Sequence, residues 1–416
     1  MLIEFSVKNF LSFKEKSTLL MNANSGNENK ENYINFEDTK ILKSAAIYGS
    51  NASGKSNFLK AIKCAINIIR SSHLIPEKGV WKDIIPFLFN EETSKKPTEF
   101  EFIVFVKGIK YRYFFSMDKA TVYSEILEAY YSQKPTLIFK RTKNNYEFNS
   151  EKRILEDIAL KNTQNKLFLS TATIWNYEKT KDIFDWFMNK VYFFGGTIIP
   201  VPNDYLSGFK EENSDLKSFA LKILNEADIQ IKNINVESKK IDVSNFINPF
   251  ENLNSFSGSK KETVYKVDFV HEVEDESGKI NTFSLNINKE SDGTRGLFNF
   301  IPYIKKALED DCLVIFDELE RSLHPMLVEY IVKLFNNDTL NKYSSQIVFT
   351  THLTNLLNIK LFRRDQIWFI EKNAKTGNSD LYPLDAFSIR KDENILKGYL
   401  NGRYGAVPYI KEEVVW

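Results

Sequence analysis

A phosphate-binding loop is predicted by eight consecutive residues, Gly49-Ser50-Asn51-Ala52-Ser53-Gly54-Lys55-Ser56. They match the pattern G-x-x-x-x-G-K-[ST] at every fixed position. The glycines allow a loop whose successive N–H groups point at a phosphate, at the positive end of the next helix dipole. We expect Lys55 to reach the β- and γ-phosphates of ATP and the hydroxyl of Ser56 to bind Mg²⁺.

A pair of acids forms the second candidate for chemistry. The segment Leu313-Val314-Ile315-Phe316 is a hydrophobic strand pattern, and it ends in Asp317 and Glu318. We expect Asp317 to hold Mg²⁺, partly through water, and Glu318 to polarise an attacking water as general base. Taken alone, a strand that ends in Asp-Glu is also typical of a solvated sheet edge. The phosphate loop upstream favours the catalytic interpretation.

The loop can bind phosphate only between a strand and a helix, and the flanking sequence predicts both elements. Residues 41–48 form an apolar run of buried-strand length that is broken by Lys43 and Ser44. Over 57–69, apolar residues recur at helical spacing. These residues are Phe58, Ala61, Ile62, Ala65, Ile66 and Ile69.

Other segments have clear periodicities. Residues 2–7 and 17–21 predict a hairpin, and residues 98–148 alternate with a period of two, which predicts an antiparallel β-subdomain. The pattern over 150–228 is mostly helical. Residues 238–262 are rich in Ser, Asn and Lys and predict a loop.

Composition excludes several classes of protein. The chain has 416 residues, 43% of them hydrophobic, so it can bury a large core and carry an inserted lobe. With 56 basic and 55 acidic residues its net charge is +1, which gives no overall cationic field. Two cysteines do not make a disulfide framework, and four histidines leave little room for a His/Cys metal site. No apolar run of about 18 residues occurs, and Glu4 does not suit a signal peptide. We expect a cytoplasmic protein with no membrane segment.

Three later segments resemble motifs of the SMC/RecF group of ABC-type ATPases. The segment 290–295, with Ser291 and Gly293, precedes a predicted helix and resembles the ABC signature in a divergent form. Residues 319–325 resemble the D-loop. The strand pattern Gln346-Ile347-Val348-Phe349-Thr350-Thr351 ends in His352, at the position of the ABC switch histidine. Asn51, Asn57 and the N-terminal Val7-Lys8-Asn9-Phe10 share this resemblance.

Each of these accessory motifs has an alternative structural interpretation. Ser-Asp-Gly-Thr before a helix is also an ordinary helix cap and turn. His352 alone could be a satisfied histidine at a strand end. His324, which Pro325 follows, is better interpreted as a helix-start residue than as a catalytic one, and His73 and His271 as structural.

Over most of its length the chain resembles the stand-alone RloA/AbiL-type AAA family ATPases of bacteria and archaea, which are often encoded in phage-defence islands. The resemblance includes VKNFLSF at the N-terminus, FEFIVFVKGIKYRYFFSM at 100–117, and residues 399–408. It implies an α/β fold, a P-loop NTPase of the ABC/SMC head type with an antiparallel β-subdomain and a mostly helical insert. The expected regions are an N-terminal lobe at 1–149, an insert for partner binding or sensing at 150–262, and a C-terminal lobe at 263–416. No Q-loop glutamine can be placed.

The resemblance also implies a mechanism. Ser291 and Gly293 of a second copy would cap the γ-phosphate of ATP bound at the phosphate loop, and His352 would contact it. Two ATP molecules would then be enclosed in a head-to-tail homodimer, or a larger homo-oligomer, with two-fold symmetry. Loss of the γ-phosphate would relax the dimer, with slow turnover.

Three hypotheses remain for the process that the ATPase drives. The first is antiviral defence with a separately encoded effector, since the residues after His352 lack a Toprim-like acidic set. The second is a DNA-repair ATPase of the RecF kind. Two short basic clusters and a candidate third support it, although interspersed acids such as Glu147 and Glu262 favour solvated loops. The two clusters are Lys140/Arg141/Lys143 and Lys260/Lys261, and the candidate third is Lys239/Lys240. The third, a subunit of an ABC transporter, fits the motif order but needs a membrane partner.

Overall fold

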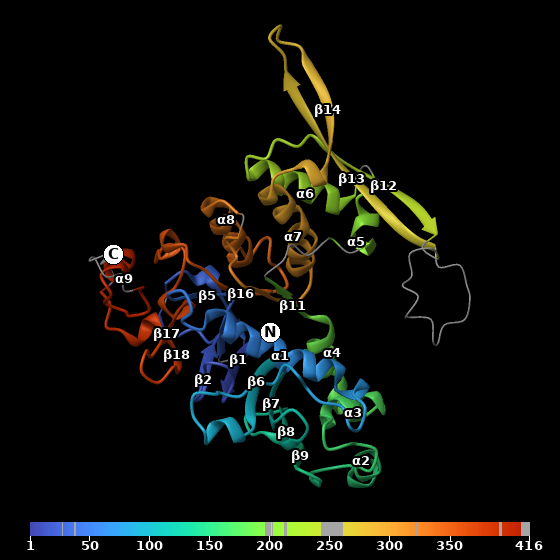
Figure 1. Cartoon of the computed structure of the whole chain (residues 1–416), viewed down its shortest axis with the longest axis vertical. Coiled ribbons are helices and arrows are strands. Elements are labelled where there is room, and N and C mark those ends of the chain that lie inside the picture. The colour runs from blue at the N-terminus through green and yellow to red at the C-terminus, as the bar shows by residue number, and fades with distance from the viewer. Residues whose placement is uncertain are drawn as a thin grey trace. The chain divides into compact units, whose positions relative to one another are not determined.

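The computed structural model describes residues 1–26, 28–36, 39–195, 201, 203–211, 214–242, 261–321, 323–390 and 393–408. The chain divides into two compact units. Unit 1 comprises Met1–Gly195, Ala307–Glu320 and Val328–Trp416, and unit 2 comprises Gly196–Lys306 and Arg321–Leu327. Figure 1 labels the helices and strands of both units.

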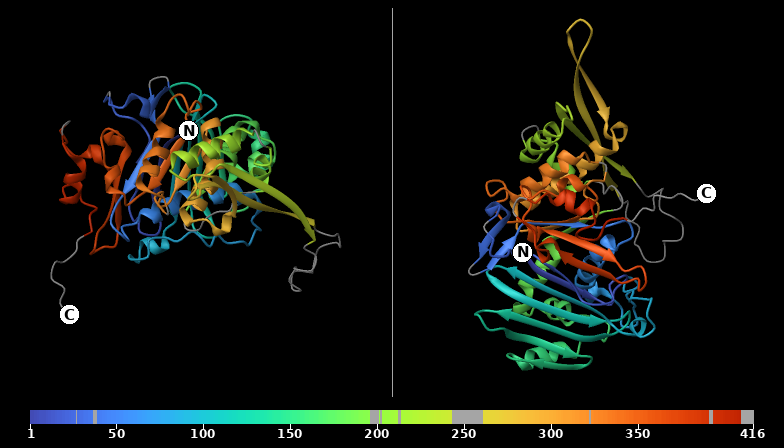
Figure 2. Two further views of the ribbon diagram at one scale, coloured as in Figure 1. Left: turned by 90° about the horizontal axis from the view of Figure 1, so that it is seen from above. Right: turned by 90° about the vertical axis from the view of Figure 1, so that its left-hand side faces the viewer.

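Unit 1 contains a seven-stranded antiparallel sheet, whose strands run side by side in the right-hand view of Figure 2. The order is β10-β9-β8-β7-β6-β1-β2. The strands are β1 (Leu2–Lys8), β2 (Ser17–Leu20), β6 (Thr98–Val106), β7 (Ile109–Met117), β8 (Val122–Tyr130), β9 (Thr136–Thr142) and β10 (Asn145–Phe148). On β6 the alternating residues Phe100, Phe102 and Val104 are buried. The antiparallel β-subdomain and the N-terminal hairpin are therefore confirmed.

A second sheet of unit 1 carries the phosphate loop. Its order is β11-β15-β16-β5-β17-β18. The strands are β5 (Ser44–Tyr48), β11 (Val191–Phe194), β15 (Leu313–Phe316), β16 (Gln346–Thr350), β17 (Ile367–Lys372) and β18 (Ser379–Pro383). The first five are parallel, and β18 at the edge runs antiparallel to β17. The three central strands β5, β15 and β16 are buried along their whole length, as parallel strands covered on both faces are.

Parallel pairing brings the carboxyl ends of these three central strands together. Phe316 on β15 lies opposite Phe349 on β16, and Thr350 lies opposite Ile47 on β5. The residues that follow the strands therefore emerge at one edge of the sheet. This edge is where open α/β sheets bind their ligands.

Helices and two short strands complete unit 1. They are β3 (Tyr33–Phe36), β4 (Thr39–Leu42), α1 (Lys55–Ser71), α2 (Lys152–Ala159), α3 (Phe168–Ile174), α4 (Glu178–Asn189), α9 (Ile395–Leu400) and, from Val328 onward, α8 (Pro325–Asn336). The six apolar residues expected on the core face of the helix after the loop are all buried in α1. Short 3₁₀ helices lie at Lys30–Asn32, Ser72–Leu74, Thr93–Lys95, Thr354–Leu356, Arg364–Gln366 and Leu384–Ala386.

The interruption in the apolar run before the loop separates two strands. β4 ends at Leu42 and β5 begins at Ser44. Between them, the side chain of Lys43 is fully buried; its ammonium group donates to the Glu31 carbonyl at 2.8 Å and pairs with Asp338. A buried ammonium group is costly without such partners. These two contacts therefore stabilise Lys43 at the position where the chain passes from β4 to β5.

Unit 2 combines helices with a three-stranded antiparallel sheet of order β12-β13-β14 (Figure 1). Its elements are α5 (Asn203–Gly208), α6 (Asp215–Glu226), β12 (Asn233–Asp242), β13 (Lys261–Glu274), β14 (Ile280–Asn286), the 3₁₀ helix Ile287–Lys289 and, through Lys306, α7 (Asp292–Glu309). Phe298 on α7 packs against Phe269 on β13 and against Phe209, with ring centroids 5.1 Å apart in both pairs. These aromatic contacts join the helices to the sheet.

The predicted insert at 150–262 is divided between the two units. Residues 150–195 belong to unit 1, because α3 and α4 pack on α1 and β11 pairs with β15. The loop predicted at 238–262 was wrong at both of its ends, since β12 extends to Asp242 and β13 begins at Lys261. Cross-strand hydrogen bonds satisfy the backbone of this polar segment without an apolar pattern. Residues 243–260 lie outside the described part of the chain.

Candidate nucleotide-binding site

The phosphate loop lies between β5 and α1, as the sequence predicts. Two of its residues have left-handed backbone conformations, Ala52 with φ 61° and Gly54 with φ 117°. A Cβ atom on Gly54 would lie 2.5 Å from Ser379 Oγ, and one on Gly49 would lie 2.5 Å from the Ile370 carbonyl oxygen. Close packing therefore requires glycine at both fixed positions of the motif, and at Gly54 the backbone conformation favours glycine as well.

Lys55 is folded back onto the loop. Its ammonium group donates to the carbonyl oxygens of Gly49 at 2.7 Å and Ser50 at 3.0 Å. Burial lowers the pKa of Lys55 from its ordinary value, although nearby carboxylates oppose this shift. Ser53 Oγ is buried and has no hydrogen-bond partner among the described residues. A cationic group and an unsatisfied hydroxyl in one loop suit a phosphate ligand.

A chain of hydrogen bonds joins the loop to the acid pair. Ser56 Oγ donates to Asp317 Oδ1 at 3.1 Å, and Thr350 Oγ1 donates to the same oxygen at 2.8 Å. The backbone N–H of Glu318 donates in turn to Thr350 Oγ1 at 2.7 Å. The structure thus brings together Ser56, Asp317 and Glu318, and it adds Thr350, which sequence reasoning did not select as a site residue. Its position at the end of the strand next to β15 was the available signal.

Glu318 and His352 face one another at the same edge of the sheet. His352 Nε2 lies 3.9 Å from Glu318 Oε1, and the two side chains are 39% and 47% exposed. Glu318 has φ 58°, a left-handed conformation that non-glycine residues seldom adopt outside functional or tightly constrained positions. Glu320 Oε1 accepts the backbone N–H of His352 at 2.5 Å, so a carboxylate of the predicted D-loop segment holds the histidine segment in place.

The oxygen atoms at this edge fit a hard divalent cation. Mg²⁺ prefers a hydroxyl or carboxylate oxygen or two from the protein and completes its shell with water and phosphate oxygens. The Ser56 hydroxyl and the Asp317 carboxylate provide such a pair. Among the residues that the structure describes, no group of three or more His, Cys, Asp or Glu is arranged to hold a metal ion. The Ser56 and Asp317 oxygens would leave the other positions around such a cation to water and phosphate oxygens.

The predicted signature residues lie in unit 2, whereas all the residues above lie in unit 1. Ser291 Oγ accepts the N–H of Thr294 at 3.1 Å and is 2.9 Å from the Thr294 hydroxyl. This contact is the bond of a helix-capping serine at the start of α7, with Gly293 in the first turn. The interpretation of this motif as a helix cap is therefore confirmed.

Several residues of the resemblance have structural roles. Asn9 Nδ2 donates to the carbonyls of Thr93, Lys96 and Pro97, and Asn57 Nδ2 donates to Ser12 Oγ. His324 directly precedes α8. The bonds of Asn9 and Asn57 tie the N-terminal segment to its neighbours.

The C-terminal segment 399–408 also has a structural explanation. The rings of Tyr399 and Tyr404 stack on Phe369 of β17 at 5.5 and 5.9 Å, and Tyr382 donates to the Tyr404 carbonyl at 2.9 Å. Gly405 has φ 66°, and a Cβ there would lie 2.7 Å from Glu371 Oε2. The segment covers one side of the parallel sheet beside the strand that leads into the phosphate loop.

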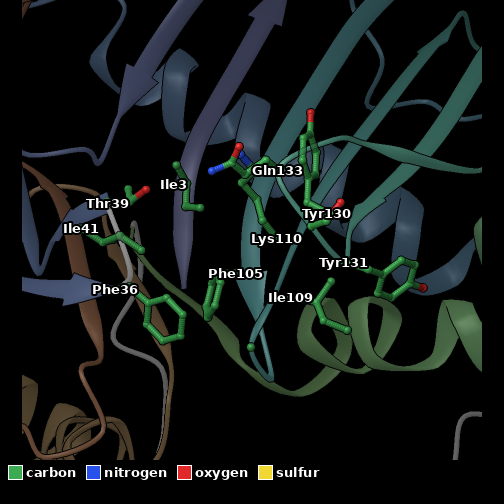
Figure 3. Close-up of a pocket in the computed structure, with 12 residues that line it drawn as sticks. Ile3, Phe36, Thr39, Ile41, Phe105, Ile109, Lys110, Tyr130, Tyr131 and Gln133 are labelled. Atoms are coloured by element: carbon green, nitrogen blue, oxygen red, sulfur yellow. The ribbon is translucent and has the colours of Figure 1, made fainter.

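A separate cavity of about 390 Å³ lies at one end of the antiparallel sheet. Figure 3 shows its lining, in which Phe36 and Phe105 lie on one side and Tyr130 and Tyr131 on the other. None of the predicted site residues lines this cavity.

The sheet order, the strand–loop–helix unit and the acid pair define an α/β fold of the P-loop NTPase type. Residues 44–358 match the family described as "AAA domain, putative AbiEii toxin, Type IV TA system", and the chain belongs to that family.

No curated protein matches the chain. Among solved structures, it is similar to the SMC head domain from Thermotoga maritima, with 14% identity, 93% of this chain and 99% of that chain covered, and a TM-score of 0.38. It is also similar to the Smc head domain with an extended coiled coil, bound to the C-terminal domain of ScpA, derived from Pyrococcus furiosus. That match has 13% identity, covers 92% of this chain and 96% of that chain, and has a TM-score of 0.37. Within the described residues, no helix is long and apolar enough to cross a membrane.

Proposed function

We propose that this protein binds and hydrolyses MgATP and acts as a nucleotide-driven switch or scaffold. The observation that supports this proposal is the hydrogen-bonded set of Ser56, Asp317, Thr350 and Glu318 at the carboxyl edge of the parallel sheet. Lys55 and the N–H groups of the loop would bind the phosphates. Ser56 and Asp317 would hold Mg²⁺, which offsets phosphate charge when bound.

Glu318 is the general base in this proposal. Its backbone N–H is fixed by Thr350, and its carboxylate projects from the strand end with 47% exposure, where water reaches it. A carboxylate in this position accepts a proton from the water that attacks the terminal phosphate. His352, 3.9 Å from that carboxylate, is close enough to orient the same water or to contact the γ-phosphate.

Closure by nucleotide is the second part of the proposal. Ser291, Gly293 and the first turn of α7 in one copy would cap the γ-phosphate held by the other copy, because the N-terminus of a helix favours an anion. By two-fold symmetry two such contacts form per dimer. Hydrolysis removes the group that both copies hold, so the dimer relaxes.

The test is the mass in solution of Glu318→Gln protein, measured by light scattering with and without MgATP. Glu318→Gln keeps the loop and removes the base, so ATP persists and we expect a dimer or larger assembly only with nucleotide. Lys55→Ala is the control and should remain unchanged. The proposed ATP-enclosing dimer is wrong if the mass of Glu318→Gln does not respond to nucleotide while hydrolysis by the unsubstituted protein depends on Lys55.

We further propose a role in antiviral defence with a separately encoded effector. Support comes from the resemblance to RloA/AbiL-type ATPases and from a family description that includes a toxin system. Co-expression with the product of the neighbouring gene, followed by phage challenge, tests this role. We expect protection to need both chains and an intact Lys55. Equal protection by the Lys55→Ala variant would contradict a nucleotide-driven role.

One of the three basic clusters gives little support to the alternative role in DNA repair. Arg141 is buried, with 1% of its side chain exposed, and it donates to the carbonyls of Lys143 and Lys166. Lys140 is paired with Glu147 at 3.2 Å. A guanidinium group that is committed to carbonyls inside the fold is not available to phosphates, so Arg141 gives no support to DNA binding by this cluster.

A further inference from the structure

A cavity of about 500 Å³ lies in unit 1 between the β17–β18 hairpin and the segment that precedes β6. Its lining combines lysines, phenylalanines and small polar groups. The lining residues are Lys14, Phe87, Phe89, Asn90, Lys372, Asn373, Ala374, Lys375, Thr376 and Gly377. They come from three segments that are far apart in the sequence, so no local motif predicts this cavity.

The charge of this cavity is entirely positive. Lys14, Lys372 and Lys375 line it, and no acidic residue does. Glu15 approaches Lys14 only to 3.8 Å and has a largely exposed side chain. Within the described residues, Lys372 and Lys375 form no ion pair with a carboxylate. Three ammonium groups around one hollow suit a ligand with several phosphates.

The aromatic ring of Phe89 lines the same cavity. Phe89 is 72% exposed, although its ring meets Phe87 edge-on at 5.7 Å. The Lys372 ammonium group lies 5.6 Å from the centre of the Phe89 ring. Such an exposed ring beside cations is the arrangement on which proteins stack unpaired bases.

The hairpin that carries two of the lysines is held in shape by its own turn. The Asn373 N–H donates to the Asn378 carbonyl at 2.8 Å, and Asn373 Oδ1 accepts the N–H groups of Lys375 and Thr376 at 2.9 and 3.0 Å. Gly377 has φ 71°, and a Cβ there would lie 2.5 Å from the Phe89 ring. The ring and the turn therefore pack together without a ligand, so that little ordering is needed on binding.

We propose that this cavity binds single-stranded nucleic acid, with phosphates on Lys14, Lys372 and Lys375 and one base on Phe89. A single strand is favoured over a duplex because an exposed ring can stack only on an unpaired base. The inference goes beyond the proposed ATPase function and does not depend on hydrolysis. It places the nucleic acid beside the phosphate loop, since Ser379 Oγ at the end of the same hairpin donates to the Ser53 carbonyl at 2.6 Å.

The experiment measures binding of a fluorescently labelled single-stranded DNA of about 12 nucleotides to the full chain by anisotropy, without ATP, over 50–200 mM salt. Three phosphate contacts predict a slope of roughly −2 for log affinity against log salt, which is an approximately 18-fold loss across that range. We expect Lys372→Gln/Lys375→Gln to weaken binding at 50 mM salt and to flatten the slope to roughly −0.7. We expect Phe89→Ala to weaken it by about 5-fold or more and Phe89→Tyr to restore it.

Matched controls separate this site from general charge and from the phosphate loop. Lys95 and Lys96 lie in the same segment as Phe89 but pair with Glu91 and Glu92, so Lys95→Gln/Lys96→Gln should bind DNA normally. Lys55→Ala should also retain DNA binding, and thermal unfolding should show that every variant is folded.

Four results would overturn the proposal. They are no binding by the unsubstituted protein at 50 mM salt, equal losses in the two lysine pairs, loss of binding in Lys55→Ala, and equal competition by a duplex or by a polyglutamate peptide. Loss in Lys55→Ala would assign the DNA to the phosphate loop, while the light-scattering test of the ATPase proposal would be unaffected.

Discussion

At the scale of single residues, Thr350 connects the two acids of the proposed site. Its hydroxyl accepts from the Glu318 N–H and donates to Asp317, and its side chain is fully buried. Thr350→Val keeps the shape, leaves the Glu318 N–H without its acceptor and leaves Asp317 Oδ1 with only its bond from Ser56, which costs about 1–3 kcal/mol in the free energy of unfolding. We expect turnover of ATP to fall by at least about tenfold, since roughly 1.4 kcal/mol in the barrier is tenfold.

Urea unfolding and steady-state hydrolysis measure these two effects. Thr350→Ser retains the hydroxyl and is the matched control, with activity close to that of the unsubstituted chain. Equal activity in Thr350→Val and Thr350→Ser would show that the hydroxyl does not position the acids.

A second residue-scale prediction concerns the buried Cys64 on α1. Burial, with a smaller contribution from Asp83, raises the pKa of the Cys64 thiol to about 12. Only the thiolate is alkylated, so the rate at Cys64 should rise about tenfold per pH unit from pH 8 to 10, where an ordinary thiol levels off near its pKa of about 8.5. Because the unfolded thiol ionises first, this group makes the free energy of unfolding decrease as the pH rises through about 9. Peptide mass spectrometry after brief iodoacetamide treatment measures the rate; a plateau by pH 9 would contradict the raised pKa.

At the scale of elements, the C-terminal segment stabilises the sheet that carries the phosphate loop. Tyr404 is buried and packs on Phe369 of β17. Tyr404→Ala removes a buried aromatic ring and should lower the free energy of unfolding by about 3–5 kcal/mol. Tyr404→Phe keeps the ring and loses only the bond to Glu393, so we expect about 1 kcal/mol or less. Denaturant titration of both variants distinguishes ring packing from the hydroxyl, and equal losses would mean that the ring is not the stabilising group.

The same scale shows which parts of the fold the sequence could predict. The phosphate loop and α1 were predictable because their residues are contiguous and their apolar spacing is regular. The bond between Thr350 and Asp317 was not, because it joins two strands whose adjacency depends on the order of the whole sheet. Likewise, the polar strand end at Ser238 pairs with Tyr265 across a long separation, and no local pattern marks it. The lysine cavity is assembled from three distant segments for the same reason.

At the scale of the whole molecule, the role of Ser291 can be separated from its role as a helix cap. Aspartate caps a helix about as well as serine, so Ser291→Asp should leave the free energy of unfolding within about 0.5 kcal/mol. Its carboxylate would, however, repel a γ-phosphate presented by a second copy. Combined with Glu318→Gln, it should abolish assembly by MgATP, whereas thermal unfolding stays unchanged.

The comparison variant is Ser291→Ala, which loses the cap at a cost of about 1 kcal/mol but adds no charge. We expect assembly to be weakened in Ser291→Ala and absent in Ser291→Asp. Normal assembly of the Ser291→Asp variant would exclude this helix end from the nucleotide contact.

The order of the parallel sheet determines when the nascent chain can form the support of the phosphate loop. The strand before the phosphate loop, β5, is flanked by β16 and β17, and both are translated long after it. Both edges of β5 are unpaired until β16 has been translated, and one edge stays unpaired until β17, which ends at Lys372, follows. Contacts of such long sequence separation form late and slowly. If the loop binds nucleotide as proposed, we expect it to do so only after residue 372 has been translated, when Asp317 and Glu318 are already present in the chain.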